Sequence, residues 1–552
     1  MSGFGFKVRL GAPEWPLVRR LLSSAVGVAL AAGGLTLAAA PATASTAVST
    51  KTLLGQLPVA SEHRGGYSGR AFGGWTDADR DGCATPQEVL IRDAVDKPVL
   101  SSGCTLTGGR WTSRYDGTHV TDSTQLRIDH LVSRQEAWQS NAWRWDADTR
   151  HRFMNDLTDS RSLLAVSRAS YAAKSGQEPT EWMPPRAAFD CRYLSWWVAV
   201  KWRWRLSINA AEETFLAKHL AACGWPSVAK PSRARVVYAT AIFSFVGDTI
   251  LGDTPKLPSD HYKYLSPVIP QIRKGVDVGF ANLEGTLTSS TNAKCSGGSA
   301  CYTFRNPPSY AHVFARAGYD VLNLANNHSH DFGTAGLDDT KGAIRGAGMH
   351  YTGLPGQITY LTSNGIRVAF VGFAPYSNTN NLLDLSTAAQ LIRRANANAA
   401  IVVVYMHAGA EGADADHVTG QEEHFVGEDR GNPKKFAHLA IDNGASIVVA
   451  SGPHVMRGME FYRHRLIAYS LGNFANFHNF NTSGVLSHSA VLRVTLTRTG
   501  GFRTARLVSV SLDSAGHATV GGGSVAFVRT LSDDDFGATA ARLSSSGVVS
   551  QP

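Results

Sequence analysis

The sequence lacks several features that would assign the protein to a simple class. No segment of the 552 residues carries a dense run of Lys and Arg, although the formal net charge is +9. The excess is spread evenly, at +3 in each of residues 1–50, 51–230 and 231–552. A basic arm that binds nucleic acid concentrates its charge in one segment. The charge therefore indicates no particular partner.

Tryptophan is missing from the second half of the chain. Eleven of the 12 Trp lie between Trp75 and Trp225, and none follows. A chain of this length also exceeds what one hydrophobic core usually supports. We therefore predict two unrelated domains that meet near Trp225. The 43% apolar and 18% charged residues exclude a wholly disordered or fibrous chain.

Long apolar runs are absent after residue 44. Before it, a basic start is followed by the apolar run Leu21–Ala40 and by the small-x-small motif Pro41–Ala44. This order predicts a cleaved signal peptide over residues 1–44 and a secreted or cell-envelope protein with no integral membrane segment after cleavage. A membrane anchor is the alternative, because the run is about long enough to span a bilayer. Its Ala and Gly content and the cleavage motif favour export.

No C-x-x-C pair occurs, which argues against a structural zinc site. The six cysteines are an even number in a chain predicted to be exported, and such a chain is expected to form disulfides. Several connectivities are possible. Pairing of nearest neighbours keeps each bond within one domain and is favoured for that reason. The resulting pairs are Cys83–Cys104, Cys191–Cys223 and Cys295–Cys301.

The composition and residue pattern change along the chain. A compact Trp-rich domain is predicted over residues 51–224, and Pro226 and Pro231 mark residues 225–237 as a linker. Residues 238–515 alternate short β-rich runs with helical stretches, which predicts an α/β domain. Residues 532–552 are rich in Asp, Ser and Gly, and we expect them to be disordered.

Near the end of the second domain the pattern becomes antiparallel. Ala490–Thr497 and Arg506–Leu512 alternate apolar and polar residues around Gly500-Gly501. This pattern predicts a β-hairpin.

In the first domain, the apolar strand Ile128–Val132 carries Asp129 and His130. Metal-assisted phosphodiester cleavage needs a carboxylate to hold a divalent ion and a neutral His to take a proton from water. Neighbouring residues of a strand point to opposite sides, so the two side chains converge only if the strand bends into a loop. A surface pair without function is the alternative.

The wider pattern adds Glu136–Trp138, Phe153–Leu157 and Pro179–Trp182. Together these motifs resemble the secreted actinobacterial HNH-type, or His-Me finger, endonuclease family. The resemblance implies a small ββα-metal nuclease-like domain that uses Mg or Mn and has DNA as its partner. It also implies the roles of four residues: Asp129 as a metal ligand, His130 as the general base, Asn155 to orient His130, and Lys174 to contact a phosphate.

One position departs from this family. Tyr171 stands where the family has Asn, three residues before Lys174. A phenol is neutral near pH 7 and ligates magnesium poorly. Three alternatives stay open: Asp129 holds the metal together with Glu136, water replaces the missing ligand, or the domain is inactive and only binds DNA.

In the second domain, polar and ionisable residues follow five predicted strands. The ends of strands are where α/β folds place their chemistry. Asp, Glu, Asn and His together form the ligand set of a two-metal hydrolytic centre, in which two ions about 3.5–4 Å apart polarise a phosphoryl group. The five motifs are Phe245–Asp248, Val278–Gly285, Asn323–Asp331, Val404–His407 and Ser451–Val455.

These motifs, with Ala325–His328 and Tyr469–Phe474 as the most specific, resemble the CapA family of capsule and poly-γ-glutamate synthesis proteins across about residues 238–515. The resemblance implies a calcineurin-type metallophosphatase β-sandwich flanked by helices. It implies one or two Mn, Fe or Zn ions and an anionic envelope or capsule polymer as partner. It also implies metal ligands, a general acid (His328), a residue that orients this acid (Asp331) and a neighbour of the site (Asn473). The implied ligands are Asp248, Glu284, Asn327, His407 and His454.

The second domain also departs from the metallophosphatase pattern. Ile250 replaces the His of the usual Asp-x-His, and only His454 follows Ser451-Gly452 where two His often occur. Fewer nitrogen ligands predict weaker metal binding or a single ion. His417 and His424 are candidates to supplement the site, and a solvated acidic loop over Glu411–Asp429 is the other interpretation.

The sequence thus predicts an exported fusion of a nuclease-like domain with a metal-dependent phosphoesterase or hydrolase that acts on an envelope polymer. The alternative is a non-catalytic scaffold for the synthesis of an anionic polymer, with an inactive, DNA-binding first domain.

Overall fold

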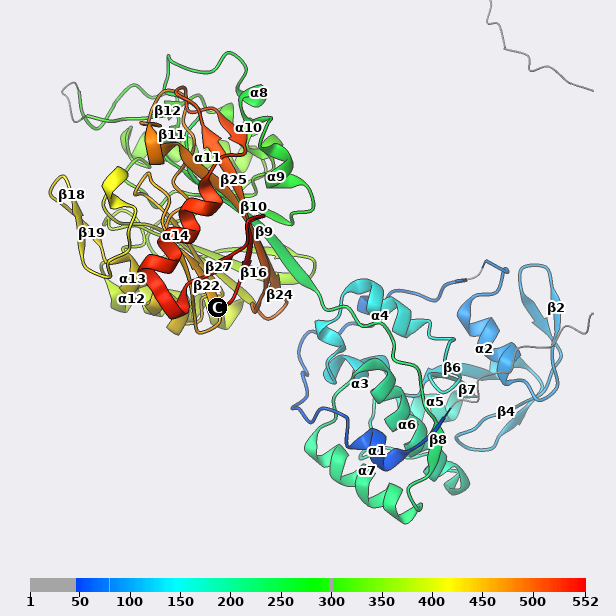
Figure 1. The fold of residues 1–552 in the computed structure, drawn as a ribbon. Helices are drawn as coiled ribbons and strands as arrows, with labels where there is room; N and C mark the ends of the chain where they lie inside the picture. The colour runs from blue at the N-terminus through cyan, green and yellow to red at the C-terminus, as the bar shows by residue number, and fades with distance from the viewer. Residues whose placement is uncertain (1–45, 79, 297–300) are drawn as a thin grey trace, which may run out of the picture. The chain divides into compact units, whose positions relative to one another are not determined.

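The computed structural model describes residues 46–552, apart from residues 79 and 297–300. The predicted signal peptide, residues 1–44, lies outside the described residues. Within the rest, no cluster of buried apolar side chains contains described residues from both sides of the Tyr238–Ala239 bond. We call the part before this bond the first domain and the part after it the second domain, and each is described by itself (Figure 1).

The predicted linker, residues 225–237, belongs instead to the first domain. Strand β8 (Ser227–Ala229) pairs with β1 (Ala47–Ser49), and Trp225 and Val236 pack against the core of this domain. The prolines suggested a linker, but apolar residues between them, such as Val228, pack against the hydrophobic core of the first domain. Packing therefore outweighs local composition here.

Two helices form much of the core of the first domain. They are α6 (Asp190–Trp204) and α7 (Ala210–Ala222). The inward face of α6 carries aromatic and aliphatic residues one and two turns apart, which are fully buried. The disulfide Cys191–Cys223 joins the start of α6 to the end of α7, and Cys83–Cys104 closes a second loop. The inward side chains are Tyr193, Trp197, Val200 and Trp204.

A short antiparallel pair and a helix carry the predicted Asp-His motif. Strand β6 (Leu126–His130) pairs with β7 (Leu163–Ser167), and α5 (Arg168–Lys174) follows directly. His130 is thus the last residue of its strand, opposite Leu163. The other elements of this domain are α1 (Thr50–Leu54), α2 (Thr85–Asp93), α3 (Arg134–Gln139), α4 (Ala147–Met154), β2 (Val99–Ser101), β3 (Thr105–Thr107), β4 (Trp111–Thr112) and β5 (His119–Val120).

The second domain is built on two mixed β-sheets. The larger sheet has the order β14-β13-β10-β9-β24-β25-β28-β27, with β23 beside β9 and β26 beside β25, and the smaller one has the order β15-β16-β17-β20-β22-β21. The larger sheet contains β9 (Thr240–Thr249), β10 (Val278–Leu283), β13 (Val321–Asn323), β14 (His350–Thr352), β23 (Asn473–Ala475), β24 (His488–Thr497), β25 (Phe502–Leu512), β26 (Ala518–Val520), β27 (Arg542–Leu543) and β28 (Val548–Ser550). The smaller sheet contains β15 (Thr359–Ser363), β16 (Ile366–Phe373), β17 (Ile401–His407), β20 (Ile447–Ser451), β21 (Met459–Tyr462) and β22 (Arg465–Ala468).

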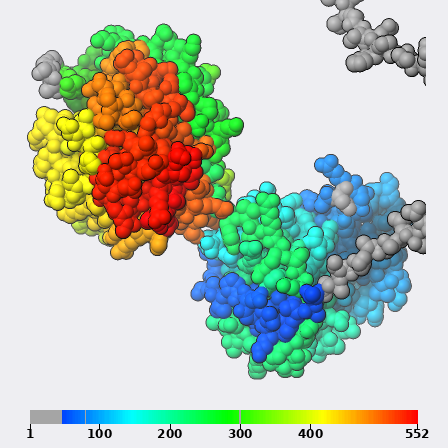
Figure 2. Space-filling model, viewed as in Figure 1, coloured from blue at the N-terminus to red at the C-terminus, as the bar shows by residue number. Residues whose placement is uncertain are grey.

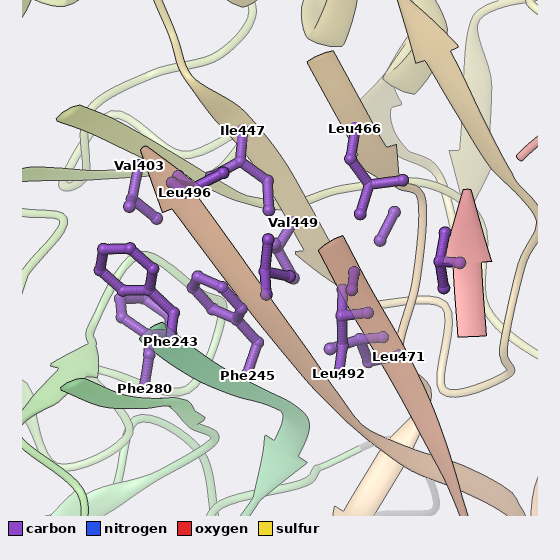
Figure 3. Packing of buried hydrophobic residues seen from close by; sticks show 14 of the residues in the cluster. Phe243, Phe245, Phe280, Val403, Ile447, Val449, Leu466, Leu471, Leu492 and Leu496 are labelled. Atoms are coloured by element: carbon purple, nitrogen blue, oxygen red, sulfur yellow. The ribbon is translucent and has the colours of Figure 1, made fainter. Parts of the chain in front are cut away.

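The core lies between the two sheets. Phe243 and Phe280 of the larger sheet pack in one cluster with Val403 and Val449 of the smaller one (Figure 3). Because successive residues of a strand face opposite sides, the alternate residues of the same strands face the helices. This arrangement is a sandwich of two sheets flanked by helices.

Helices cover the outer face of each sheet. On the larger sheet they are α8 (His261–Leu265), α9 (Ile269–Arg273), α10 (Tyr310–Ala317) and α11 (Gly333–Gly346). On the smaller sheet they are α12 (Leu385–Asn398) and α13 (Pro433–Asp442). Two short strand pairs lie outside both sheets: β11 (Thr286–Leu287) with β12 (Arg305–Asn306), and β18 (Glu423–Phe425) with β19 (Glu428–Gly431).

The segment 532–552, predicted to be disordered, is ordered. Helix α14 (Ser524–Phe536) continues into it, and β28 pairs with β25 with Val549 opposite Ala505. Figure 2 shows this segment, in red, packed on the body of the second domain. The polar average composition of this segment concealed single apolar residues, such as Leu543 and Val549, that are buried in the core.

None of the helices in the described part of the chain is long and apolar enough to cross a membrane.

Candidate functional sites

Parallel strands bring polar residues of both sheets to one edge. In the larger sheet, Asn282 near the end of β10 lies opposite Asp248 of β9 on one side and Asn323 of β13 on the other. In the smaller sheet, His407 ends β17 opposite Ser451 of β20. The carboxyl ends of these strands therefore supply one site.

Three of the predicted metal ligands lie close together there. Asp248, Glu284 and His407 each offer one ligand atom within 4.8 Å of the other two, and all three side chains are fully buried. His407 Nε2 lies 3.5 Å from Glu284 Oε1, and its Nδ1 lies 3.7 Å from Asp248 Oδ1. We call this group the metal-ligand cluster.

His454 approaches the cluster from the loop after β20. Its Nδ1 lies 3.3 Å from Asp248 Oδ2 and 2.9 Å from Asn473 Oδ1. The backbone of His454 has φ +58°, which is unusual for a residue other than Gly and keeps the ring in this position. The N–H of Gly452 donates to Asp248 Oδ2 over 3.1 Å. The loop thus holds the aspartate as well as the histidine.

The residue at the centre of the cluster is Asn282, which sequence reasoning did not single out. Its Nδ2 donates to Asp248 Oδ1 over 2.8 Å and also to Glu284 Oε2. Its Oδ1 accepts from Asn323 Nδ2 over 2.8 Å and from Asn326 Nδ2 over 3.0 Å. The sequence did indicate a role for Asn282 in the site. Positions 282 and 284 lie two residues apart at the end of a strand, so their side chains face the same side.

The hydrogen bonds to the cluster come from Asn326 rather than from its neighbour Asn327, the predicted ligand. Asn326, rather than Asn327, bonds to Asn282 and to the carbonyl of Leu283. Oδ1 of Asn327 is buried and has no hydrogen-bond partner. The role of Asn327 as a ligand stays a prediction.

The buried carboxylates of the cluster repel each other. Burial raises the pKa of Glu284 well above its usual value, and the charges of Asp248 and Glu411 raise it further. Burial also acts to raise the pKa of Asp248, but His407 and His454 outweigh it and hold that pKa well below the usual value. A bound cation would relieve this repulsion and favour the ionised form of each carboxylate.

The donor atoms of the cluster fit a divalent metal ion. His407 Nε2 and Glu284 Oε1 are both buried, and neither has a hydrogen-bond partner. Buried polar atoms without partners are rare, so each one calls for a missing partner. Carboxylate oxygen and imidazole nitrogen are ligands that Zn, Mn and Fe accept.

The predicted general acid is fixed by a carboxylate. His328 Nδ1 lies 2.8 Å from Asp331 Oδ2, and Lys294 Nζ lies 2.7 Å from Asp331 Oδ1. The backbone N–H of His328 donates to Asn326 Oδ1 over 3.0 Å, and Asn326 in turn bonds to Asn282. One hydrogen-bonded chain therefore joins His328 to the metal-ligand cluster.

A second carboxylate near the cluster comes from the loop after β17. Glu411 Oε2 lies 3.7 Å from His454 Nε2, and Arg430 donates to Glu411 Oε1 over 2.8 Å. Sequence reasoning passed over Glu411 because it stands in a flexible-looking loop. The two histidines weighed as supplements do not join the cluster: His417 pairs with Asp535, and His424 is exposed on β18.

In the first domain, the neutral ring of His130 is held by its neighbours. Its ring stacks between Trp75 and Phe153 at centroid distances of 5.4 and 5.6 Å. Burial, followed by the charge of Arg134, lowers the pKa of His130 to about 3. Its Nε2 lies 3.0 Å from the carbonyl oxygen of Met154. A carbonyl only accepts, so Nε2 carries the proton and Nδ1 has a free lone pair.

Asn155 does not orient His130, contrary to the prediction. Its Oδ1 accepts from the N–H of Thr76 over 3.0 Å and from the hydroxyl of Thr85 over 2.9 Å. Its Nδ2 donates to the carbonyl of Gly74 over 3.1 Å. The side chain ties down the loop before α2, and the carbonyl of Met154 orients the histidine instead.

Asp129 and Lys174 contact each other rather than the groups predicted for them. Lys174 is fully buried, and its Nζ lies 2.7 Å from Asp129 Oδ2 and donates to the carbonyl of His130 over 2.9 Å. The hydroxyl of Tyr115 donates to the same carboxylate oxygen over 2.7 Å. The lysine therefore neutralises Asp129 and cannot reach a phosphate. With Tyr171 in place of an amide, these residues do not fit a divalent ion.

Glu136, the alternative metal ligand, is committed elsewhere. It accepts from Lys201 Nζ over 2.7 Å in a fully buried group that also contains Glu212. Its oxygen atoms approach those of Glu62 and Glu178, but it remains paired with the lysine. Burial is the main cause that raises the pKa of Glu212, to about 7. This group holds α3, α6 and α7 together.

A cavity of about 230 Å³ opens beside His130. It is polar, and its walls come from β6, the start of α3 and the end of α5. Its main side chains are Tyr67, Asp129, His130, Arg134 and Tyr171. We call it the His130 cavity.

Comparison with known proteins finds a family that the second domain is similar to. Residues 242–478 match the family described as bacterial capsule synthesis protein PGA_cap. The PGA biosynthesis protein CapA of Bacillus subtilis is 30% identical over 254 residues, which cover 42% of this chain and 62% of the relative. The chain thus spans less than two thirds of that relative's length.

Another relative and one solved structure are also similar to this chain. An uncharacterized secreted protein of Arthroderma benhamiae is 37% identical over 158 residues, which cover 29% of this chain and 76% of the relative. The 5'-nucleotidase precursor of Thermus thermophilus aligns with a TM-score of 0.31 at 14% identity, over 51% of this chain and 56% of that one. At this TM-score the alignment is too distant to assign a site.

Proposed function

This chain belongs to the family of the Arthroderma benhamiae secreted protein and carries a PGA_cap domain, and on that premise we propose an exported, metal-dependent hydrolase that acts on an anionic envelope or capsule polymer. The observation that carries the proposal is the metal-ligand cluster. Two carboxylates and an imidazole converge in a buried site, and two of their ligand atoms have no partner.

Each residue has a stated part in this proposal. Asp248, Glu284 and His407 hold the cation, with His454 beside them. Bound there, a divalent cation acts as a Lewis acid on the bond to be cleaved. Asn282 holds both carboxylates toward the site, so that little rearrangement is needed on binding.

His328 supplies the proton for the leaving group. Its Nδ1 faces Asp331, so the proton to be donated is on Nε2. Asp331 also pairs with Lys294, which fixes the carboxylate that orients the imidazole. This pair is a general acid with a fixed donor atom.

Export is the second part of the proposal. Three disulfides, Cys83–Cys104, Cys191–Cys223 and Cys295–Cys301, occur in the structure with the predicted pairing, and one relative is described as secreted. Disulfides persist outside the cytosol. We infer that the chain works in the envelope or outside the cell.

Metal analysis of the secreted protein, combined with assays on a phosphodiester and on poly-γ-glutamate, tests the hydrolase. We expect bound Mn, Fe or Zn and turnover in the native protein, and loss of both in His407→Ala. His328→Ala should keep the metal but lose turnover by a factor of about 100 or more. The matched control is His350→Ala, an exposed histidine in the same domain. A metal-loaded protein that is inactive on both substrates would favour the non-catalytic scaffold.

A second candidate function concerns the first domain. We propose that it acts on nucleic acid at the His130 cavity, because His130 is neutral, has Nδ1 free and lines a polar cavity. Plasmid nicking, assayed both with Mg or Mn and in EDTA, should vanish in His130→Ala. Nicking that persists in this variant would mean that His130 is not the base.

A further inference from the structure

The His130 cavity contains a cation without an anionic partner. Arg134, at the start of α3, is half-buried and lines the cavity beside His130. In the described part of the chain its guanidinium makes no ion pair or hydrogen bond. A guanidinium carries five N–H donors in a planar fork that matches carboxylate and phosphate oxygens. An unpaired Arg in a cavity therefore points to an anionic ligand.

The same cavity is poorly suited to a divalent ion. Asp129, its carboxylate, already accepts from Lys174 and Tyr115, and the lysine is fully buried. Both contacts go to Oδ2, and Lys174 already balances the charge of this carboxylate, so a divalent cation near Oδ1 would gain less attraction than beside an unpaired carboxylate. The positive charge that faces a ligand is thus supplied by Arg134 rather than by a metal.

Two aromatic rings flank the cavity. Tyr67 and Tyr171 are 36% and 37% exposed, which is high for large side chains, and both line the cavity. Exposed tyrosines beside a basic group are the means by which proteins bind single-stranded nucleic acid, because bases stack on the rings while the cation contacts the backbone. A polycarboxylate offers no such flat group.

The backbone that lines the cavity next to Tyr171 also has an unusual conformation. Ser175 lines the cavity with φ +48°, a backbone conformation that residues with a Cβ rarely adopt. The N–H of Ser175 donates to the carbonyl of Tyr171, so the turn is tied to the residue whose ring flanks the cavity. Strain of this kind persists where the surroundings enforce it, and it gathers at functional sites.

We propose that the His130 cavity binds a phosphodiester of single-stranded nucleic acid through Arg134, with a base against Tyr67 or Tyr171, and that this binding needs no divalent cation. The inference rests on the proposed action of the first domain on nucleic acid, and it removes the metal from the binding step. Tyr171 departs from the nuclease pattern, and in this proposal its ring contacts a base instead of failing as a metal ligand.

The test is fluorescence anisotropy of a labelled oligothymidylate with the full-length protein, in EDTA and in magnesium. We expect equal binding in both buffers. Arg134→Gln should weaken binding about tenfold or more, because a charge-assisted contact to phosphate is lost. Tyr171→Ala should weaken it about fivefold or more through lost stacking. The control is Arg127→Gln, which removes the same charge from an exposed position of β6 outside the cavity and should change binding less than twofold.

The outcomes separate the two proposals. Binding that requires magnesium would overturn the metal-free inference and leave the nucleic-acid role intact. No binding in either buffer would overturn the nucleic-acid role itself. Equal losses in Arg134→Gln and Arg127→Gln would mean that only overall charge attracts the strand. Displacement of the oligonucleotide by poly-γ-glutamate at equal charge would show a general polyanion site. Thermal unfolding of each variant confirms that it is folded.

Discussion

At the scale of single residues, two glycines have nearly the same backbone but very different surroundings. Gly452 has φ +111° and Gly412 has φ +114°, both in the region that favours glycine. A Cβ on Gly452 would lie 3.0 Å from the backbone nitrogen of Ala408 and 3.3 Å from the ring of His407. A Cβ on Gly412 would meet no atom within 4 Å. The pair therefore separates backbone strain from crowding at the metal-ligand cluster.

We predict that Gly452→Ala is the more harmful of the two changes. Both substitutions carry the backbone penalty, but only Gly452→Ala pushes against His407 and the strand end. We expect it to lower the free energy of unfolding by about 2 kcal/mol more than Gly412→Ala and to reduce the metal content. Urea unfolding and metal analysis of both variants check this. Equal losses of unfolding free energy in the two variants would mean that His407 moves away from the added methyl group without a cost in stability.

The residues of the metal-ligand cluster could be found in the sequence because they stand at the ends of predicted strands. Asp248, Glu284 and His407 each follow or end an apolar run, so the pattern placed their motifs at strand ends, whereas their role as ligands came from the family resemblance. Asn282 was passed over because an amide at a strand end looks like a simple terminator. The ion pair of Lys174 with Asp129 was not predictable, because the two residues are 45 positions apart and meet only through tertiary packing.

At the scale of secondary structure, strand β28 has one face in the core and one in solvent. Val549 is 1% exposed and belongs to the cluster between the sheets, whereas its neighbour Val548 is 43% exposed. Adjacent residues of a strand face opposite sides, so the two valines differ in burial but not in propensity.

We predict opposite outcomes for a charge at these two positions. Val549→Asp buries a carboxylate with no partner and should cost about 3 kcal/mol or more, whereas Val548→Asp should change stability by less than about 0.5 kcal/mol. Chemical unfolding followed by circular dichroism measures both. If the segment were disordered, as its composition suggested, neither variant would differ from the native protein.

A pH-dependent contact ties the loop after β17 to helix α14. His417 Nδ1 lies 2.7 Å from Asp535 Oδ1, and the N–H of Val418 donates to Asp535 Oδ2 over 2.9 Å. The hydrogen bond that His417 donates to Asp535 is the main cause that raises the pKa of His417, and the charges of Asp535 and Asp416 add to it. A raised pKa in the folded state means that protonation of His417 stabilises the fold.

This contact should matter at low pH and disappear at high pH. Its contribution is fully present below the pKa of His417 in the unfolded chain and is lost as the pH rises through the higher pKa of the folded state. The histidine is half-exposed, so we expect less than about 1 kcal/mol between native and His417→Gln at pH 5.5, and no difference at pH 8.5. Urea unfolding at the two pH values measures it. A difference that grows with pH would contradict the assignment.

Secondary structure was predictable where the local pattern was regular. The hairpin is confirmed, with β24 and β25 antiparallel on either side of the turn at Gly500. The helical stretches expected between the strands of the second domain are also present, for example α13, which begins at Pro433. The predicted linker and tail failed for one reason: a few apolar residues within a polar segment decide its packing, and an average over the segment hides them.

At the scale of the whole molecule, the disulfides are unequally divided. The first domain has two, which span 21 and 32 residues, and the second domain has one, which spans 6. A cross-link that closes a longer loop restricts the unfolded chain more, and loops of these two sizes contribute about 3 kcal/mol each. Together with the separate hydrophobic cores, this predicts that the domains differ in their response to reduction.

We predict two transitions in scanning calorimetry, of which mainly one shifts on reduction. The Tm of the first domain should fall by about 10 °C or more, whereas that of the second domain should change little. The matched control is Cys295→Ser with Cys301→Ser, which should leave the first transition in place. A single transition, or equal shifts of both, would mean that the cores do not unfold separately.

The position of β28 in the sheet has a consequence for the order of synthesis. Among the described strands, this one is made after all the others, yet its Val549 fills the core between the two sheets. A nascent chain therefore carries an open core until about residue 550 has emerged. The second domain completes its fold late, and the residues of the metal-ligand cluster are held in a finished sandwich only once this strand is in place.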